Sequence, residues 1–130
     1  MNYRVVPACT FTSPEMARVG LTEAQAREAG IEVRIGRFGY AASGRALAMD
    51  ETEGLVKLIG DAKTDQLIGA HIMGAEAGEL IAAPALAMQM EATVEDLAHT
   101  IHTHPTLSET LLEAAEDYYG RSIHTPPKRR

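Results

Sequence analysis

The sequence has few of the residues that disulfide scaffolds and nucleic-acid-binding domains need. Cys9 is the only cysteine among 130 residues, so the chain can form neither an internal disulfide nor a dithiol redox centre. There is no tryptophan, there are two phenylalanines, and the net charge at pH 7 is −6. Without a basic stripe or many stacking side chains, nucleic-acid binding is not expected. We expect Cys9 to be a buried, unreactive thiol, because no cation adjoins it to lower its pKa.

Long hydrophobic runs are also missing. The longest apolar stretch, residues 80–88, is too short to cross a bilayer and contains Pro84. The first residues, MNYRVVPACTF, lack the apolar core of a signal peptide. We therefore expect a cytoplasmic protein with no membrane partner. The length suits one domain over residues 1–124, followed by a basic, disordered tail over residues 125–130.

The first third of the chain has the pattern of a strand, a turn and a helix. VVPACTFTSPEMARVG is rich in strand formers but contains Pro7 and Pro14, which is typical of an edge strand followed by a turn. Thr22, with Gln25 three residues later, forms a capping-box motif at the start of a predicted helix. Gly30 suits the position just after the end of that helix.

The middle of the chain predicts more strands. The first residues of IEVRIGRF alternate, with Ile31, Val33 and Ile35 on one face and Glu32 and Arg34 on the other, which indicates a half-buried strand. Residues 40–52 have no clear period and are expected to form a loop. GLVKLIGD and QLIGAHIMG are apolar runs separated by AKTDQ, which predicts a β-hairpin covered on both faces by helices or by a partner.

The last part of the chain predicts helices. Residues 75–91 have a helical pattern that Pro84 should kink or interrupt. Thr93 should cap a short helix, and residues 106–119 should form a final helix closed by Gly120. The order of these elements predicts an α+β fold, in which helices pack against an antiparallel sheet.

The segment HTHPTLSE, which begins at His102, admits three interpretations. The first is a metal site, because two histidines two residues apart in an extended segment project to the same side. A third ligand would have to come from His99, Glu109 or Asp96. A lone His-x-His is a weak signal, since no helical His-x-x-x-His motif, Cys-x-x-Cys pair or Asp-rich loop accompanies it.

The second interpretation is an ordinary helix start. Thr106 and Glu109 have the spacing of a capping box, in which the threonine side chain bonds the third amide of the helix and the glutamate reaches back. Pro105 restricts His104 to an extended conformation. This interpretation accounts for the proline, the threonine and the glutamate, but it does not explain the two histidines.

The third interpretation is a proton-transfer pair that coexists with the cap. A carboxylate has about four acceptor sites, so Glu109 can cap the helix and also accept a hydrogen bond from His104. That bond would select one imidazole tautomer, leave the other nitrogen available as a base, and favour the imidazolium. The helix N-terminus acts in the opposite direction, because it disfavours a cation.

The same segment, preceded by VEDLAHTI and followed by an Ala-rich helix, closely resembles the C-terminal motif of the dihydrolipoamide dehydrogenases. These enzymes belong to the flavin-dependent pyridine nucleotide–disulfide oxidoreductases. VPACTFTSPEMARVGLTEAQARE is similar to the opening strand of the family's interface, or dimerisation, domain. GLVKLIGDAKTDQLIGAHIMGAEAGELI resembles the core of that domain, so the resemblance covers nearly the whole chain.

The resemblance implies specific roles for three residues. His104 would be the acid–base residue that faces the redox disulfide of the other subunit, and Glu109 would orient it. The His104–Pro105 bond would be cis, and these two residues would meet the partner subunit's flavin. His102 would shape the loop or serve only in packing. Apart from the resemblance, we expect Arg45, Lys57 and Asp61 to be surface charges.

The resemblance also implies cofactors and partners. A full-length parent would be a homodimer that uses FAD and NAD and oxidises the lipoyl domains of a 2-oxo-acid dehydrogenase complex. The FAD-binding domain, the NAD-binding domain and the paired redox cysteines have no counterpart here, so either the chain is a piece of a longer enzyme or its gene is truncated. We therefore expect the chain alone to bind no cofactor and to be inactive.

Other functions remain open from the sequence. A glutathione-reductase-like disulfide reductase also has a His-Pro-Thr-x-x-Glu segment, although the longer form found here favours the lipoamide enzyme. A pure assembly module with inert histidines is another possibility, because residues 80–90 form an apolar, Ala- and Met-rich helix face that could pack against a second copy. A metal-dependent hydrolase would require bound zinc.

Overall fold

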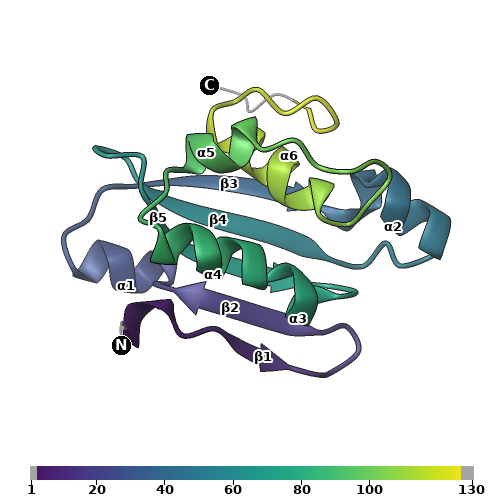
Figure 1. Ribbon diagram of the computed structural model, residues 1–130, viewed down its shortest axis with the longest axis horizontal. Helices are drawn as coiled ribbons and strands as arrows, with labels where there is room; N and C mark the ends of the chain where they lie inside the picture. Colours follow the sequence, from purple (N-terminus) through teal and green to yellow (C-terminus); the bar gives the residue numbers. More distant parts are fainter. Residues whose placement is uncertain (1–2, 127–130) are drawn as a thin grey trace.

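Five strands form one antiparallel sheet in the order β1-β2-β5-β4-β3 in the computed structural model, which describes residues 3–126 (Figure 1). The strands are β1 (Ala8–Thr10), β2 (Met16–Gly20), β3 (Val33–Gly39), β4 (Leu55–Asp61) and β5 (Leu67–Met73). The helices are η1 (Tyr3–Val5), α1 (Glu23–Glu28), η2 (Tyr40–Ala42), α2 (Gly44–Met49), α3 (Ala77–Leu80), α4 (Ala82–Gln89), α5 (Val94–His99) and α6 (Glu109–Tyr118). The predicted α+β fold with an antiparallel sheet is confirmed.

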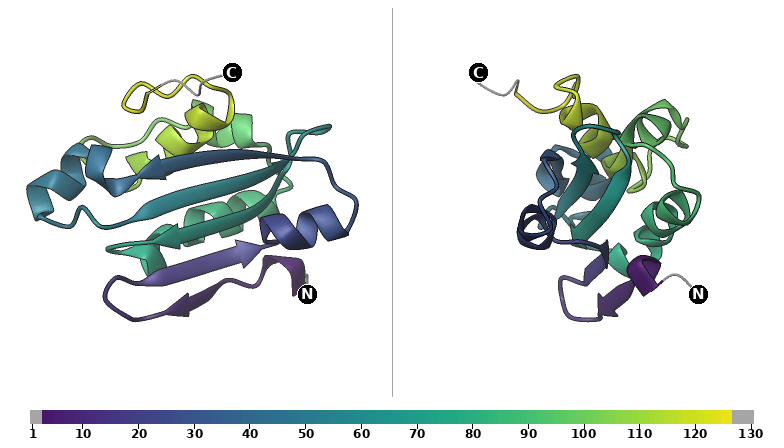
Figure 2. Two further views of the ribbon diagram at one scale, coloured as in Figure 1. Left: turned by 180° about the vertical axis from the view of Figure 1, so that it is seen from behind. Right: turned by 90° about the vertical axis from the view of Figure 1, so that its left-hand side faces the viewer.

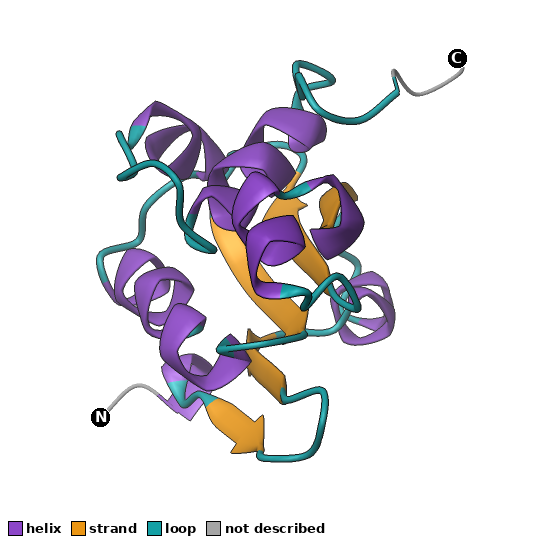
Figure 3. Ribbon diagram, turned by 90° about the vertical axis from the view of Figure 1, so that its right-hand side faces the viewer, coloured by secondary structure: helices purple, strands orange, loops and turns teal. Residues whose placement is uncertain are grey.

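Helices pack on one face of the sheet, mainly over β3, β4 and β5. α6 packs on β3 and β4, α4 packs on β5 and β2, and α5 packs against α6. Figure 3 shows this helix layer against one side of the strands, and the right-hand view of Figure 2 places α1 on the opposite side from α4. The main core lies between the sheet and the helix layer and includes Val56, Leu58, Ile72 and Leu111.

Several predicted boundaries are confirmed. β1 is an edge strand, and the β4–β5 hairpin forms where the apolar runs predict it. The Thr22–Gln25 capping box is complete, and Gly30 has a positive φ of 77° after α1. The helical segment around Pro84 is interrupted, since α3 ends at Leu80 and α4 begins at Ala82. Proline fits the first turn of α4 because its missing N–H has no partner to lose there.

The predicted alternation is confirmed in the first half of β3, because Val33 and Ile35 are half-buried whereas Arg34 is exposed. Gly36 and the Phe38 side chain lie on the opposite face, beneath the helix layer, and both residues are buried. A Cβ at Gly36 would collide with the carbonyl of Ala114 on α6. The helix therefore lies directly on the glycine, a contact that the apolar pattern does not predict.

The prediction of a loop over residues 40–52 is wrong, because this segment forms η2 and α2. The Ser43 side chain accepts a hydrogen bond from the Ala46 N–H at 3.3 Å and so caps α2. The Tyr40 side chain is fully buried, and its hydroxyl donates to the carbonyl of Ala75 at 2.9 Å. A six-residue helix has too few turns to display a helical period in the sequence.

Cys9 is predicted to be a buried, unreactive thiol. The thiol is half-buried, and burial followed by the charge of Glu15 raises its pKa, which agrees with an unreactive thiol. Within residues 3–126, no helix combines the length and apolarity needed to span a membrane. Most of the predicted basic tail, residues 127–130, lies outside the described residues.

The contact between α6 and β3 predicts a specific destabilisation. Gly36→Ala should lower the free energy of unfolding by about 1–3 kcal/mol, because the added methyl group has to push α6 off the sheet. Urea unfolding followed by circular dichroism measures this. Gly44→Ala is the matched control, since a Cβ there meets nothing within 4 Å. Equal stabilities of the two variants would contradict the contact.

Candidate active-site loop

The segment between α5 and α6 forms an exposed loop around Pro105. The His104–Pro105 peptide bond is cis, as the resemblance implies. The Thr106 hydroxyl donates to the carbonyl of Thr103 at 2.7 Å and lies 2.8 Å from the Ser108 hydroxyl. These short-range bonds hold the backbone on both sides of the proline, so the loop has a defined shape although it faces solvent.

The predicted capping box at this helix is only half formed. A Glu109 carboxylate oxygen accepts the Thr106 N–H at 2.9 Å, as predicted. The Thr106 side chain does not cap the helix, because it bonds Thr103 and Ser108 instead, and α6 begins after Ser108 without a side-chain cap. The helix therefore starts two residues later than the motif predicts.

Glu109 also binds the histidine before the proline. His104 Nδ1 lies 2.8 Å from Oε1 and 3.1 Å from Oε2 of Glu109. Because a carboxylate only accepts, this geometry assigns the proton to Nδ1. The His104 side chain is 78% exposed and that of Glu109 is 27% exposed. The structure thus brings the two predicted residues together, with the imidazole at the surface and the carboxylate behind it.

Opposing effects set the charge of Glu109. Burial acts to raise the pKa of this carboxyl, but the hydrogen bonds from the Thr106 amide and from His104 outweigh it and lower the pKa below the ordinary value. The carboxylate is therefore ionised well below neutral pH, and it remains an acceptor over the range in which imidazole titrates.

His102 occupies a different environment from His104. It is half-buried, and its Nε2 is buried without a hydrogen-bond partner among the described residues. Burial lowers the pKa of His102, although the nearby Glu109 carboxylate acts to raise it. This placement agrees with the packing role considered for it and makes it a poorer candidate for an exposed base.

The alternative of a metal site finds no support in the described residues. Within residues 3–126, no three His, Cys, Asp or Glu side chains lie close enough together to hold a metal ion. Asp96 accepts the N–H and the hydroxyl of Thr93 as the cap of α5, and His99 pairs with Glu95 at 2.9 Å. Two of the proposed third ligands are thus occupied elsewhere.

A further histidine–carboxylate pair, between His124 and Glu113, is not predicted from the sequence. Glu113, one turn after Glu109 on α6, lies 2.7 Å from His124 Nδ1 and accepts the Ser122 hydroxyl at 2.7 Å. No sequence motif signals this pair, because it forms only when the segment after α6 turns back along the helix.

Lys57 is predicted to be a surface charge, but it is half-buried and its Nζ lies 2.7 Å from Glu23.

The pairing of His104 and Glu109 predicts a measurable titration. His104→Gln should raise the pKa of the Glu109 carboxyl toward its ordinary value, because a hydrogen bond and a nearby positive charge are lost. Carboxyl ¹³C NMR measures this shift. His99→Gln, which removes the partner of Glu95, should leave the Glu109 pKa unchanged. An unchanged Glu109 pKa in His104→Gln would argue against the pair.

Because folding lowers the pKa of the Glu109 carboxyl, the contribution of this group to stability depends on pH. A carboxyl whose pKa is depressed by folding contributes stability above its unfolded-state value, here the ordinary 4.5, and loses it as the pH falls through the folded-state pKa. The stability difference between the wild-type protein and Glu109→Gln should therefore shrink in acid.

Comparison with known families identifies the fold of this loop and sheet. Residues 6–115 match the sequence model described as "Pyridine nucleotide-disulphide oxidoreductase, dimerisation domain". Among solved structures, LpdA from Mycobacterium tuberculosis has a TM-score of 0.84 at 32% identity, covering 89% of this chain and 25% of that one. RclA from Escherichia coli, described as an HOCl-induced flavoprotein disulfide reductase, has a TM-score of 0.78 at 37% identity, covering 82% of this chain and 24% of that one.

Curated relatives agree with this match. The dihydrolipoyl dehydrogenase of Thermus scotoductus is 56% identical over 119 residues, which are 92% of this chain and 26% of that protein. The mitochondrial dihydrolipoyl dehydrogenase of Pisum sativum is 48% identical over 124 residues, which are 95% of this chain and 25% of that protein. The chain thus spans about a quarter of the length of these relatives. It belongs to the dimerisation-domain family of the pyridine nucleotide-disulphide oxidoreductases, and its domain is of the kind found in dihydrolipoyl dehydrogenases.

Proposed function

We propose that this chain is the dimerisation domain of a dihydrolipoyl dehydrogenase and supplies an acid–base pair, His104 and Glu109, to the partner subunit. One observation supports this above all: His104 Nδ1 is held by a carboxylate while the imidazole stands 78% exposed at the surface. A ring in that state has Nε2 available to a proton donor outside the chain. The reacting groups must come from elsewhere, because Cys9 is the only thiol.

The pair can accept a proton from a thiol. In this proposal His104 Nε2 takes the proton from a dihydrolipoamide thiol, which leaves the thiolate that attacks disulfides. Glu109 then stabilises the imidazolium by the charge-assisted hydrogen bond at Nδ1. The carboxylate is already ionised, since the bonds from Thr106 and His104 lower its pKa despite burial. His104 thus moves a proton between Nε2 and the substrate while Glu109 keeps the ring oriented.

The loop also fits a contact with a flavin held by the partner. His104 and Pro105 are both exposed and adjacent in the loop, so the imidazole and the pyrrolidine ring are accessible to a group on another subunit. This suits an edge contact with a planar group on another subunit. In the full-length enzyme, bound FAD would supply the electron acceptor for the reduced form of the redox disulfide, and NAD would be the final acceptor. The chain alone, without that disulfide, is proposed to be inactive.

The surface for the second copy is proposed to lie on the helix layer. Leu86 and Met90 are 64% and 72% exposed on α4 and just after it, four residues apart and therefore on one side. Ile101, at the start of the active-site loop, is 97% exposed. Neighbouring exposed apolar side chains that form a patch are typical of contacts between subunits, and Leu86 and Met90 are such neighbours. A homodimer formed there would bring the loop of one copy toward the other.

His104→Gln tests the acid–base proposal. In a chimera in which this domain replaces the matching quarter of the Thermus scotoductus enzyme, the variant should reduce turnover of dihydrolipoamide by about 10²–10⁴-fold, the usual contribution of a positioned base. Steady-state assays over a range of pH measure the loss. Sedimentation should show an unchanged dimer.

The control distinguishes a base from an inert histidine. His99→Gln alters an exposed histidine of the same region that pairs with Glu95, and turnover should stay at the level of the unaltered chimera. If His104→Gln were equally active, the histidines would be inert and the domain would serve assembly alone.

The dithiol that His104 deprotonates is proposed to be carried by the lipoyl domains of a 2-oxo-acid dehydrogenase complex.

Leu86→Glu tests the dimer surface. A buried, unpaired carboxylate is costly, so the variant should shift the chimera from dimer toward monomer in sedimentation experiments. Phe11→Glu places the same charge on a side chain that is 79% exposed beyond β1, and the dimer should persist. A dimer unaffected by Leu86→Glu would place the contact elsewhere.

A further inference from the structure

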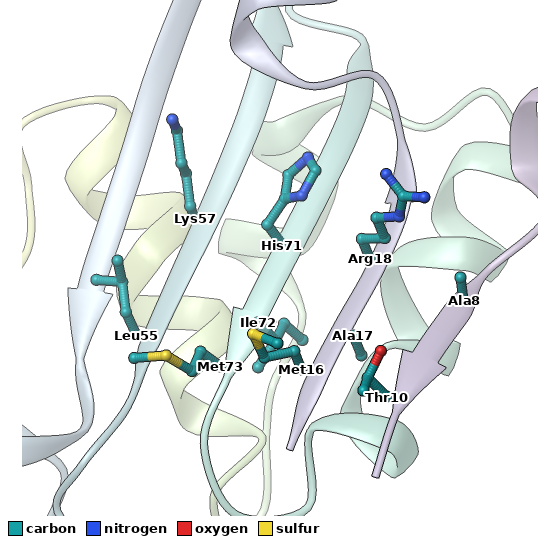
Figure 4. A pocket seen from close by; sticks show the side chains of 10 residues that line it. All are labelled: Ala8, Thr10, Met16, Ala17, Arg18, Leu55, Lys57, His71, Ile72 and Met73. Carbon is teal, nitrogen blue, oxygen red and sulfur yellow. The ribbon is translucent and has the colours of Figure 1, made fainter. Parts of the chain in front are cut away.

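The sheet face opposite the helix layer has a row of basic side chains that the proposed function does not use. Arg18 on β2, His71 on β5 and Lys57 on β4 are cross-strand neighbours, and Arg37 on β3 continues the row. Neighbouring strands lie about 4.8 Å apart, so these side chains stand side by side. Figure 4 shows Lys57, His71 and Arg18 in this order across the strands.

A second row, made of apolar side chains, runs beside the basic row on the same face of the sheet. Each of its members is two residues away from a basic residue on the same strand. Met16 and Met73 are directly opposed, and Leu55 is the next neighbour of Met73. They are 49%, 38% and 38% exposed, respectively. The apolar row and three members of the basic row, Arg18, His71 and Lys57, line a groove of about 500 Å³ that also includes Thr10 and Ala8 of β1 (Figure 4). One side of the groove is therefore basic and the other is apolar.

The basic row is not neutralised by the chain's own carboxylates. Glu23 contacts Lys57 Nζ at 2.7 Å and Arg37 at 3.6 Å, and it also pairs with Arg27 at 3.0 Å. Arg18 has no carboxylate partner among residues 3–126. One carboxylate thus serves three cations, and a fourth cation remains. This surplus stands out in a chain whose net charge is −6.

The state of Glu23 agrees with a positive surface. Hydrogen bonds from Lys57 and then from Arg27 lower the pKa of its carboxyl to about 2. His71 is held in place, since its Nε2 lies 3.0 Å from the carbonyl of Leu21 and must donate to it. The basic row is therefore an ordered feature at Lys57 and His71, and Arg18 is the cation still available to a ligand.

We propose that this groove binds a small amphipathic carboxylate, whose carboxylate group lies against Arg18 and whose unbranched acyl body lies on Met16 and Met73. The volume falls in the range of about 300–1,000 Å³ that is usual for small-ligand sites. A guanidinium binds a carboxylate through two parallel hydrogen bonds, and methionine side chains adapt to flexible apolar ligands. This site is separate from the acid–base pair and independent of the proposed function.

The separation of the two rows favours one small molecule over an acidic protein segment. An amphipathic acid has one charged end and one apolar end, and the groove offers one basic row beside one apolar row. An acidic segment would place charges along its length and would meet the uncharged row of Met16, Met73 and Leu55. The charge pattern therefore matches a head-and-tail ligand.

Titration with octanoate tests the proposal. In the 130-residue protein with ¹³C-labelled methionine methyl groups, octanoate should shift the NMR signals of Met16 and Met73. The signal of Met90, which is 72% exposed outside the groove, should not move and reports non-specific apolar binding. Octanol, which has the same chain without a carboxylate, should bind at least about tenfold more weakly, because the charged hydrogen bonds are missing.

Matched variants identify the residues. Arg18→Glu should raise the dissociation constant of octanoate by about tenfold or more, whereas Arg45→Glu, which places the same charge change on α2, should leave it unchanged. Equal binding to both variants would overturn the proposal, as would shifts of the Met90 signal equal to those of Met16. Binding of hexaglutamate in the absence of octanoate binding would assign the face to an acidic protein segment instead and would equally overturn it.

Discussion

The contact of α6 with the sheet is the constraint on which the rest of the structure depends. The helix lies directly on Gly36, and a carboxylate oxygen of Asp117 accepts the N–H of Arg37 at 2.8 Å on the edge strand β3. Because a helix is rigid over ten residues, this contact at its C-terminal half also places its first residue, Glu109. The position of the Glu109 carboxylate is therefore decided by packing far from the loop.

Glu109 has two structural roles at once. It accepts the Thr106 N–H and also holds His104 Nδ1, so one carboxylate both ends the loop and orients the imidazole. Glu113 repeats the arrangement one turn later with His124, but that pair fastens the segment after α6 and also binds Ser122. The same local chemistry thus serves a candidate acid–base pair in one turn and tethering of the chain in the next.

The two faces of the sheet differ in what they present to other molecules. The helix layer exposes the histidine loop together with the apolar Leu86 and Met90, which suits a second copy of the same domain. The opposite face exposes the basic row beside the apolar row, which suits a small amphipathic anion. This division follows from the topology, because alternate residues of each strand face opposite sides.

The sequence by itself determined the element types where the period or the caps were strong, namely the β4–β5 hairpin, the Thr22–Gln25 cap and the break before Pro84. It also indicated His104, Pro105 and Glu109, because these residues lie within one short segment. Tertiary structure decided that α6 lies on Gly36 of β3, which partners Thr106 binds, and that Glu113 meets His124. These features depend on contacts between residues far apart in the chain or on competition among several local hydrogen bonds. No periodicity along the sequence reports them.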